Sequence, residues 1–105
     1  VGNGSAYTTV ATTATLDVGT AYVVSAWDDG TNLNVQINSG TVASATRPTV
    51  SAGSSTATIG KSNTSAASYF NGLMYQVLQT KNDGGTDAER TEAKAYCATK
   101  GGVTL

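Results

Sequence analysis

Side chains able to carry chemistry are few in this chain, because its 105 residues include no histidine and only 7 acidic groups. The absence of histidine excludes Ser-His-Asp and Cys-His catalytic arrangements, and zinc or copper sites of ordinary composition. Both glutamates, Glu89 and Glu92, fall in a segment with helical signals rather than on a strand. The sequence therefore offers no obvious carboxylate pair of the kind that glycoside hydrolysis uses, and we predict that the protein is not an enzyme.

Four aspartates in two expected loops are the candidate metal ligands. Asp28 and Asp29 share one loop, and Asp83 and Asp87 share the other. Carboxylate oxygens suit calcium, but a good calcium site needs about six to eight oxygen ligands. We favour the simpler interpretation, in which Asp29 shapes a turn, Asp28 is solvated and Asp87 caps a helix. No cofactor is expected, and calcium binding is the alternative.

A row of amide side chains offers hydrogen bonds to the hydroxyl groups of a sugar. The amides alternate with apolar residues along one expected strand, so they share its outward face. An aromatic ring beside them, Trp27 or Tyr22, would supply a stacking platform. We favour the interpretation that the outward amides are hydrated and that Trp27 lies in the core, with ligand binding as the alternative. The candidate ligand-binding residues are Asn32, Asn34, Gln36, Asn38 and Trp27.

An expected β-hairpin positions these side chains. Its strands cover residues 20–27 and 31–38, and the Asp-Gly pair between them is a strong signal for a short turn. The second strand alternates strictly between apolar and polar residues, which gives it one core face and one outward face. The residues expected on the core face are Leu33, Val35 and Ile37.

Further strands are expected on either side of the hairpin. Residues 41–47 predict a strand that ends before a proline, which has no N–H for a central ladder, and residues 55–61 predict another. The β-branched residues of 1–18 favour an edge strand or a segment that lies against a neighbour. Residues 73–78 are apolar on both faces, which predicts a strand covered by a second layer.

A capped helix is predicted over residues 86–100. Thr86 and Glu89 have the spacing of a capping box, and two glycines after the helix provide a left-handed stop. The helix is short and weakly amphipathic, so it must pack on another element to be stable. We expect Met74 and Leu78 of the preceding strand to contact it. The helical residues expected at this contact are Ala88, Ala95 or Tyr96. Cys97, also on the helix, is expected to be a small packed hydrophobe.

Two motifs in these elements resemble the concanavalin A-like, laminin-G-like jelly-roll domains. The first joins an aromatic-Asn-Gly strand at 69–72 to the helical segments 86–90 and 96–101, and resembles the end of such a domain. The second is the hairpin at 27–40, which resembles a hairpin from the middle of the domain. Cys97 is a departure, because an aliphatic residue usually follows the helical tyrosine in this family. The resemblance implies an all-β, antiparallel jelly-roll β-sandwich with one short C-terminal α-helix, formed by residues 1–105 as a single domain.

The resemblance covers about residues 20–105, whereas β-sandwiches of this kind often reach about 200 residues. The sandwich is therefore expected to be incomplete. Either the chain is a fragment, or its open sheet edges are completed by another copy or by another protein, because unpaired edges invite strand addition. We adopt the second hypothesis, so a protein partner or self-assembly is expected.

Composition narrows the class of protein further. Charged residues make up 12% of the chain, its net charge is -1, and no lysine or arginine precedes Arg47, so a phosphate-binding surface for nucleic acid is not expected. The chain has no long apolar run, so no membrane span is expected. Abundant Thr, Ser, Ala and Gly favour a virion or extracellular location. We predict a non-catalytic structural or decorating module of such an assembly, of the capsid decoration, tail or fibre type; the alternative is a carbohydrate-binding or adhesion module.

Overall fold

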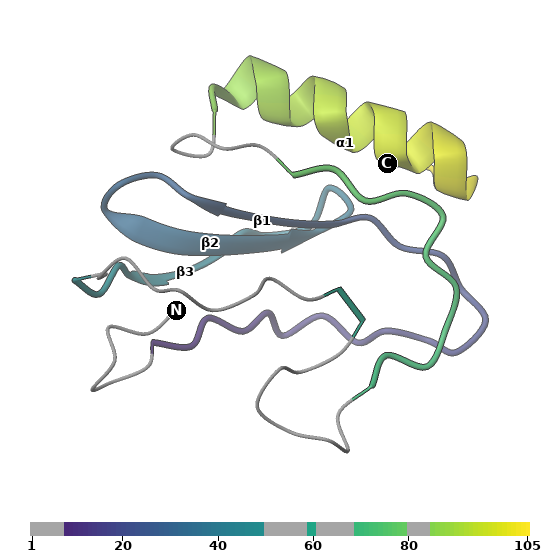
Figure 1. Cartoon of the computed structure of the whole chain (residues 1–105), viewed down its shortest axis with the longest axis horizontal. Helices are drawn as coiled ribbons and strands as arrows, with labels where there is room; N and C mark the ends of the chain where they lie inside the picture. Colours follow the sequence, from purple (N-terminus) through teal and green to yellow (C-terminus); the bar gives the residue numbers. More distant parts are fainter. Residues whose placement is uncertain (1–7, 50–58, 61–68, 80–84) are drawn as a thin grey trace.

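The computed structural model describes residues 8–49, 59–60, 69–79 and 85–105. In these ranges the chain forms three strands and one helix, in the order β1 (Val24–Asp28), β2 (Asn32–Ile37), β3 (Ala43–Thr46) and α1 (Asp87–Gly101). The strands make one antiparallel sheet in the order β1-β2-β3, and α1 lies across one of its faces (Figure 1). The antiparallel sheet and the C-terminal helix of the predicted fold are thus confirmed for the described residues, and the sheet has three strands.

The predicted hairpin is present with the expected turn. β1 and β2 pair in antiparallel register, with Trp27 opposite Asn34. Asp29 closes the turn, because its Oδ1 accepts from the backbone N–H groups of Thr31 and Asn32 at 2.9 and 2.7 Å. Gly30 has a φ of 88°, a conformation that a residue without Cβ adopts at little cost. The sequence therefore located both strands and the residue that shapes the turn.

The strand predictions outside the hairpin have mixed outcomes. β3 lies within the predicted range 41–47 and pairs with β2, and the Arg47 N–H donates to the Thr31 carbonyl at 2.8 Å. The predicted strand 55–61 lies outside the described residues except for 59–60. No regular strand forms over residues 73–78, so that prediction is wrong for this structure. The reason is the lack of a described neighbour with which its backbone could form a ladder.

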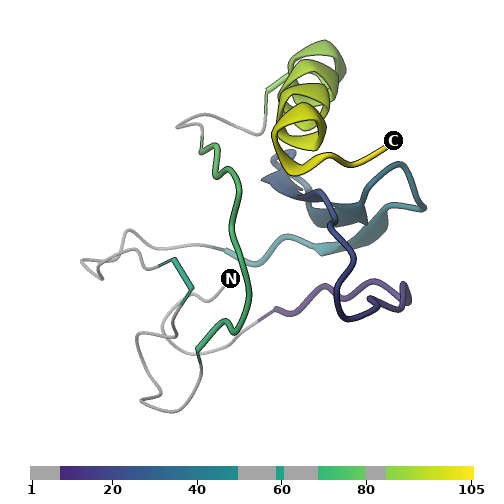
Figure 2. The ribbon, with the colours of Figure 1, turned by 90° about the vertical axis from the view of Figure 1, so that its right-hand side faces the viewer.

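The sheet lies between two other layers. Residues 8–18 run along the face opposite α1, and both views agree on this order (Figures 1 and 2). Residues 11–14 line a shallow hollow together with Ile37 and Ala43, which identifies this as the apolar face of β2. The polar face of β2, which carries Asn34 and Gln36, lies under α1. The prediction that this polar face points to solvent is therefore wrong.

The helix begins and ends as the sequence predicts. Thr86 is the N-cap, and both bonds of its capping box with Glu89 are present. Gly102 adopts the left-handed conformation at φ 65°, and its N–H bonds to carbonyl groups of the last turn. The helix faces the sheet with residues three and four positions apart, as one side of an α-helix must. The partly or fully buried residues of this side are Arg90, Ala93, Lys94, Cys97, Ala98 and Gly101.

The predicted packing surface of the helix is wrong, because Ala88, Ala95 and Tyr96 are exposed. The helix instead places two long basic side chains over the polar face of the sheet, where an indole ring and an amide receive them. The helix is only weakly amphipathic, so these contacts, rather than an apolar stripe, determine which of its sides faces the sheet. Among the described residues, the buried hydrophobic core consists of Val23, Leu33 and Ala98 only.

Residues 69–79 run beside the sheet as a separate stretch of backbone (Figure 2). Phe70 donates its N–H to the Gly60 carbonyl at 2.7 Å. Tyr75 approaches the end of α1, since a Cβ built on Gly101 would lie 3.8 Å from its Cδ2 atom. Met74 likewise approaches Gly60, because a Cβ built on Gly60 would lie 3.4 Å from the Met74 Cε atom. The expected contacts of Met74 and Leu78 with the helix stay predictions.

In the part of the chain that the structure describes, no helix is both long and apolar enough to cross a bilayer.

Candidate functional site

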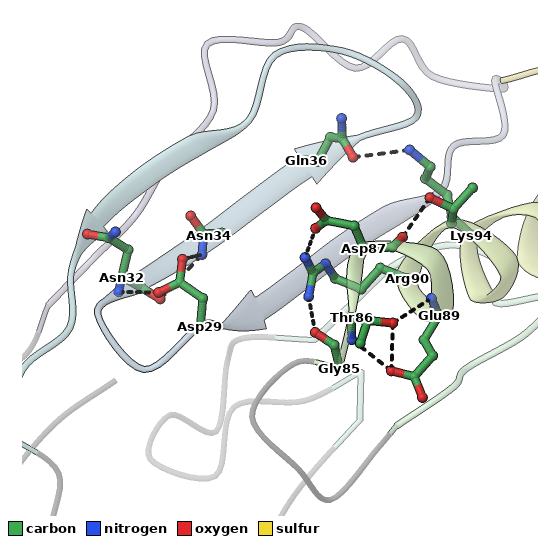
Figure 3. Close-up of polar contacts among 11 residues, drawn as sticks. Asp29, Asn32, Asn34, Gln36, Gly85, Thr86, Asp87, Glu89, Arg90 and Lys94 are labelled. Atoms are coloured by element: carbon green, nitrogen blue, oxygen red, sulfur yellow. Dashed lines mark hydrogen bonds and ion pairs between the residues drawn. The ribbon is translucent and has the colours of Figure 1, made fainter.

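The sheet carries a network of polar side chains centred on Asn34 (Figure 3). This side chain is 5% exposed. Its Nδ2 donates to the Asp29 Oδ2 at 3.0 Å, and its Oδ1 accepts from the Ser44 hydroxyl at 2.6 Å. The network thus joins the turn, β2 and β3, so Asn34 holds the sheet together rather than facing solvent. Sequence analysis missed Ser44, because a serine on a short strand carries no signal of its own.

Hydrogen bonds keep the turn carboxylate ionised. The backbone N–H groups of Asn32 and Thr31 and the side-chain amide of Asn34 all donate to Asp29, and they lower its pKa. Donors that favour the charged form of a carboxyl group have this effect. Asp29 therefore has the turn-shaping role that the simpler interpretation assigned to it.

Asp28 forms an ion pair rather than standing free in solvent. Its Oδ2 lies 2.5 Å from the Nε of Arg47, and its Oδ1 accepts from the Gly30 N–H at 2.8 Å. The bond from Arg47 is the main cause that lowers the Asp28 pKa, followed by the bond from Gly30. The pair connects the end of β1 with the residue that follows β3, and 34% of the Asp28 side chain is still exposed, so this carboxylate is partly solvated as predicted and is also paired.

The candidate calcium ligands do not converge in the described structure. Asp87 lies in the first turn of α1 and pairs with Arg90, while Thr86 is the cap, so Asp87 does not cap the helix as predicted. Asp83 lies outside the described residues. Among the residues that the structure describes, no three acidic or cysteine side chains gather into a potential metal cage. The aspartates of the hairpin have roles in the turn and in an ion pair.

An open hollow of about 190 Å³ separates α1 from the sheet. Its floor includes the indole of Trp27, over which the guanidinium carbon of Arg90 lies 5.1 Å from the ring centroid. The Nζ of Lys94 donates to the Oε1 of Gln36 at 3.2 Å, which closes the far side (Figure 3). Sequence analysis missed Arg90 and Lys94. Their partners, an indole ring and an amide, lie about 60 positions earlier in the chain, so no local sequence pattern marks the contacts. The hollow is lined by Ser25, Trp27, Gln36, Val42, Asp87, Arg90, Thr91 and Lys94.

Most of the predicted ligand-binding amides bond within the protein. Gln36 donates through Nε2 to the Gly40 carbonyl at 2.7 Å in addition to its bond with Lys94. Asn38 has a φ of 50° and accepts from the Val23 N–H through Oδ1 at 2.8 Å. Asn32 is half-buried near the turn. Only Gln36 and Trp27, of the five predicted residues, line the hollow.

No protein-family model, curated protein or solved structure matches the chain. The resemblance to the laminin-G-like jelly rolls therefore stays a prediction.

Proposed function

We propose that this protein is a non-catalytic structural module of a virion or extracellular assembly, of the decoration, tail or fibre type. One observation carries the proposal: the exposed apolar segment that ends before the helix. Six of its large side chains are between 47% and 78% exposed. They are Phe70, Leu73, Met74, Tyr75, Val77 and Leu78.

A cluster of this kind is unusual on the surface of a free monomer. Single exposed hydrophobic residues are common, but a contiguous apolar patch marks a site of interaction with another molecule. The cluster is the more notable because the described core is so small. A module that buries these side chains against a partner gains the hydrophobic stabilisation that its own core lacks.

The sheet edges support the same proposal. β1 and β3 are the outer strands of the three-stranded sheet, and each has one edge without a neighbour in the described structure. Unpaired edges are templates for strand addition. We infer that the finer fold is a jelly-roll sandwich that becomes complete in the assembly, and that the Thr- and Ser-rich, weakly charged composition suits an extracellular surface.

The absence of a catalytic role is part of the proposal. The chain has no histidine, and the described carboxylates Asp28, Asp29 and Glu89 serve an ion pair, a turn and a cap. The ion pair, the turn and the cap each favour the charged form of the carboxylate. A general acid must instead carry a proton at neutral pH.

Immunogold electron microscopy tests the location. Antibodies raised against the chain should label extracellular structures or virus particles of the source, and the label should repeat at a regular spacing on them. Labelling confined to the interior of cells would overturn the proposal. An antibody preabsorbed with the purified chain is the control for specific labelling.

Carbohydrate binding is a second candidate, favoured by the hollow beside Trp27. Its lining includes an amide, two hydroxyl groups and an ammonium group, which can form hydrogen bonds with sugar hydroxyls. A sugar ring that stacks on Trp27 would take the place of the Arg90 guanidinium over the indole. Glycan-array binding by the wild-type chain that disappears in the variant Trp27→Ala would support this function. Binding that is equal in the two proteins, or absent from both, would reject it.

A further inference from the structure

We propose that residues 71–79 pair as an antiparallel strand with the same residues of a second copy, about a two-fold axis at Tyr75. This inference rests on the proposed function, since it names the partner and the surface that such an assembly would use. A different protein as the partner is the competing outcome of the experiment below.

The backbone of the segment is available for pairing. In the described structure, no hydrogen bond links the backbone of residues 71–79 to another backbone group, whereas Phe70 just before them is bonded to Gly60. The one side-chain bond to this stretch comes from Gln76, whose Nε2 donates to the Val77 carbonyl at 3.1 Å. A stretch with open N–H and C=O groups and alternating side chains adds readily to another strand.

The sequence of the segment is self-complementary about Tyr75. In an antiparallel pair centred there, Tyr75 faces its own copy and Leu73 faces Val77. The outer positions bring Asn71 opposite Gln79, so this face has an apolar centre and polar ends. The other face brings Met74 opposite Gln76 and Gly72 opposite Leu78. Cross-strand apolar and aromatic pairs of this kind stabilise antiparallel ladders, and a two-fold interface requires such self-complementarity. The residues on the first face are Asn71, Leu73, Tyr75, Val77 and Gln79.

Charge and area also favour a second copy. Residues 69–79 contain no charged side chain, so two copies meet without like-charge repulsion. A fully exposed aromatic side chain has about 150–250 Å² of surface that can be buried. With the exposed fractions given above, the six large apolar side chains of residues 69–79 together expose on the order of 500 Å² to solvent. A standard interface buries about 800 Å² per partner, of which about 65% is apolar in homodimers. The apolar area exposed along residues 69–79 is of the same size as that share.

The other edges fit self-pairing less well. β3 has only four residues, and the Arg47 that follows it pairs with Asp28 at the end of β1. Charged groups at strand ends oppose edge-to-edge association. Residues 71–79, by contrast, are nine consecutive residues without a charge, and in the described structure their side chains are all exposed.

Sedimentation velocity of the full chain over a range of concentrations tests the inference. The wild-type chain of 10.6 kDa should associate to a species of about twice that mass. The double variant Leu73→Lys/Val77→Lys places lysines directly opposite each other at both pairs, and its Kd should rise on the order of tenfold or more. An equimolar mixture with Leu73→Glu/Val77→Glu should restore the dimer, because each lysine then faces a glutamate.

The substituted residues are exposed in the single chain, so its fold is expected to survive, and circular dichroism checks this. Val18→Lys is the control, because Val18 is a fully exposed valine that lies outside the segment. Association that persists in the double-lysine variant, or that the mixture fails to restore, overturns the inference. A wild-type chain that stays monomeric overturns it too, and points to a different protein as the partner. The proposed function is judged separately by the location of the chain.

Discussion

Arg90 of α1 lies over the ring of Trp27 on β1, with 5.1 Å between the guanidinium carbon and the ring centroid. Together with the bond from Lys94 to Gln36, this contact fixes the helix to the polar face of the sheet. The helix is thus held by two long basic side chains that reach across a hollow, rather than by a broad apolar surface. Removing either side chain should therefore loosen the helix more than the sheet.

The contact between Arg90 and Trp27 is testable by truncation. Arg90→Ala should lower the free energy of unfolding by about 1 kcal/mol, since a cation over an exposed ring contributes about 0.5–1 kcal/mol and the bonds to Asp87 and Gly85 are lost as well. Urea denaturation followed by Trp27 fluorescence measures the change. Glu92→Ala, on the exposed side of the same helix, is the control and should stay close to wild type. Equal stability of the two variants would show that α1 is held in another way.

Asn34 should be the amide whose loss is most costly. Asn34→Ala removes the bonds that this buried side chain makes with the Ser44 hydroxyl and the Asp29 Oδ2. The loss of one neutral and one charged hydrogen bond should lower the free energy of unfolding by about 1–3 kcal/mol. Asn32→Ala is the matched control on the same strand, and its effect should be smaller because Asn32 is less buried. The two variants are compared by urea denaturation. A larger loss in Asn32→Ala would contradict the assigned network.

Stability should fall in acid because three carboxyl groups have a lowered pKa in the folded chain. These groups belong to Asp28, Asp29 and Glu89. A lowered folded pKa means that the stabilisation is complete above the ordinary value of about 4 and disappears as the pH falls through the folded value. Thermal unfolding from pH 7 to pH 2 should show a decreasing Tm below about pH 4.

The ion pair of Asp28 should account for part of this acid sensitivity. Asp28→Asn removes a group that titrates and should flatten the decrease of Tm in acid, while it lowers Tm at pH 7 because the pair with Arg47 is lost. Asp17→Asn is the control, since its side chain lies outside this pair. An unchanged pH profile in Asp28→Asn would refute the role of the pair.

The capping box at the start of α1 predicts that two substitutions of Thr86 lower the stability by different amounts. Thr86→Ala removes the side-chain acceptor for the Glu89 N–H and should lower the free energy of unfolding by about 1 kcal/mol. Thr86→Ser keeps a hydroxyl at the same position and should retain most of the stability. Helix content from circular dichroism, together with urea denaturation, distinguishes the two. If the two variants are equally unstable, the cap does not support the helix.

The sequence by itself determined the local elements. The Asp-Gly turn and the strict alternation after it located the hairpin, and Thr86 with Glu89 and Gly102 fixed both ends of the helix. Each of these signals acts between residues a few positions apart, where backbone geometry and hydrogen bonding leave few choices. The turn role of Asp29 was predictable for the same reason.

The tertiary structure decided which surfaces meet. Alternation showed that β2 has a polar face and an apolar face, but the helix covers the polar one, and Asn34 is buried there. The helix could present several sides, and the side with Arg90 and Lys94 is chosen by an indole and an amide far away in the sequence. Residues 73–78 have the pattern of a strand, yet a strand also needs a neighbour for its backbone hydrogen bonds. Periodicity identifies faces, whereas the match between distant surfaces determines what covers them.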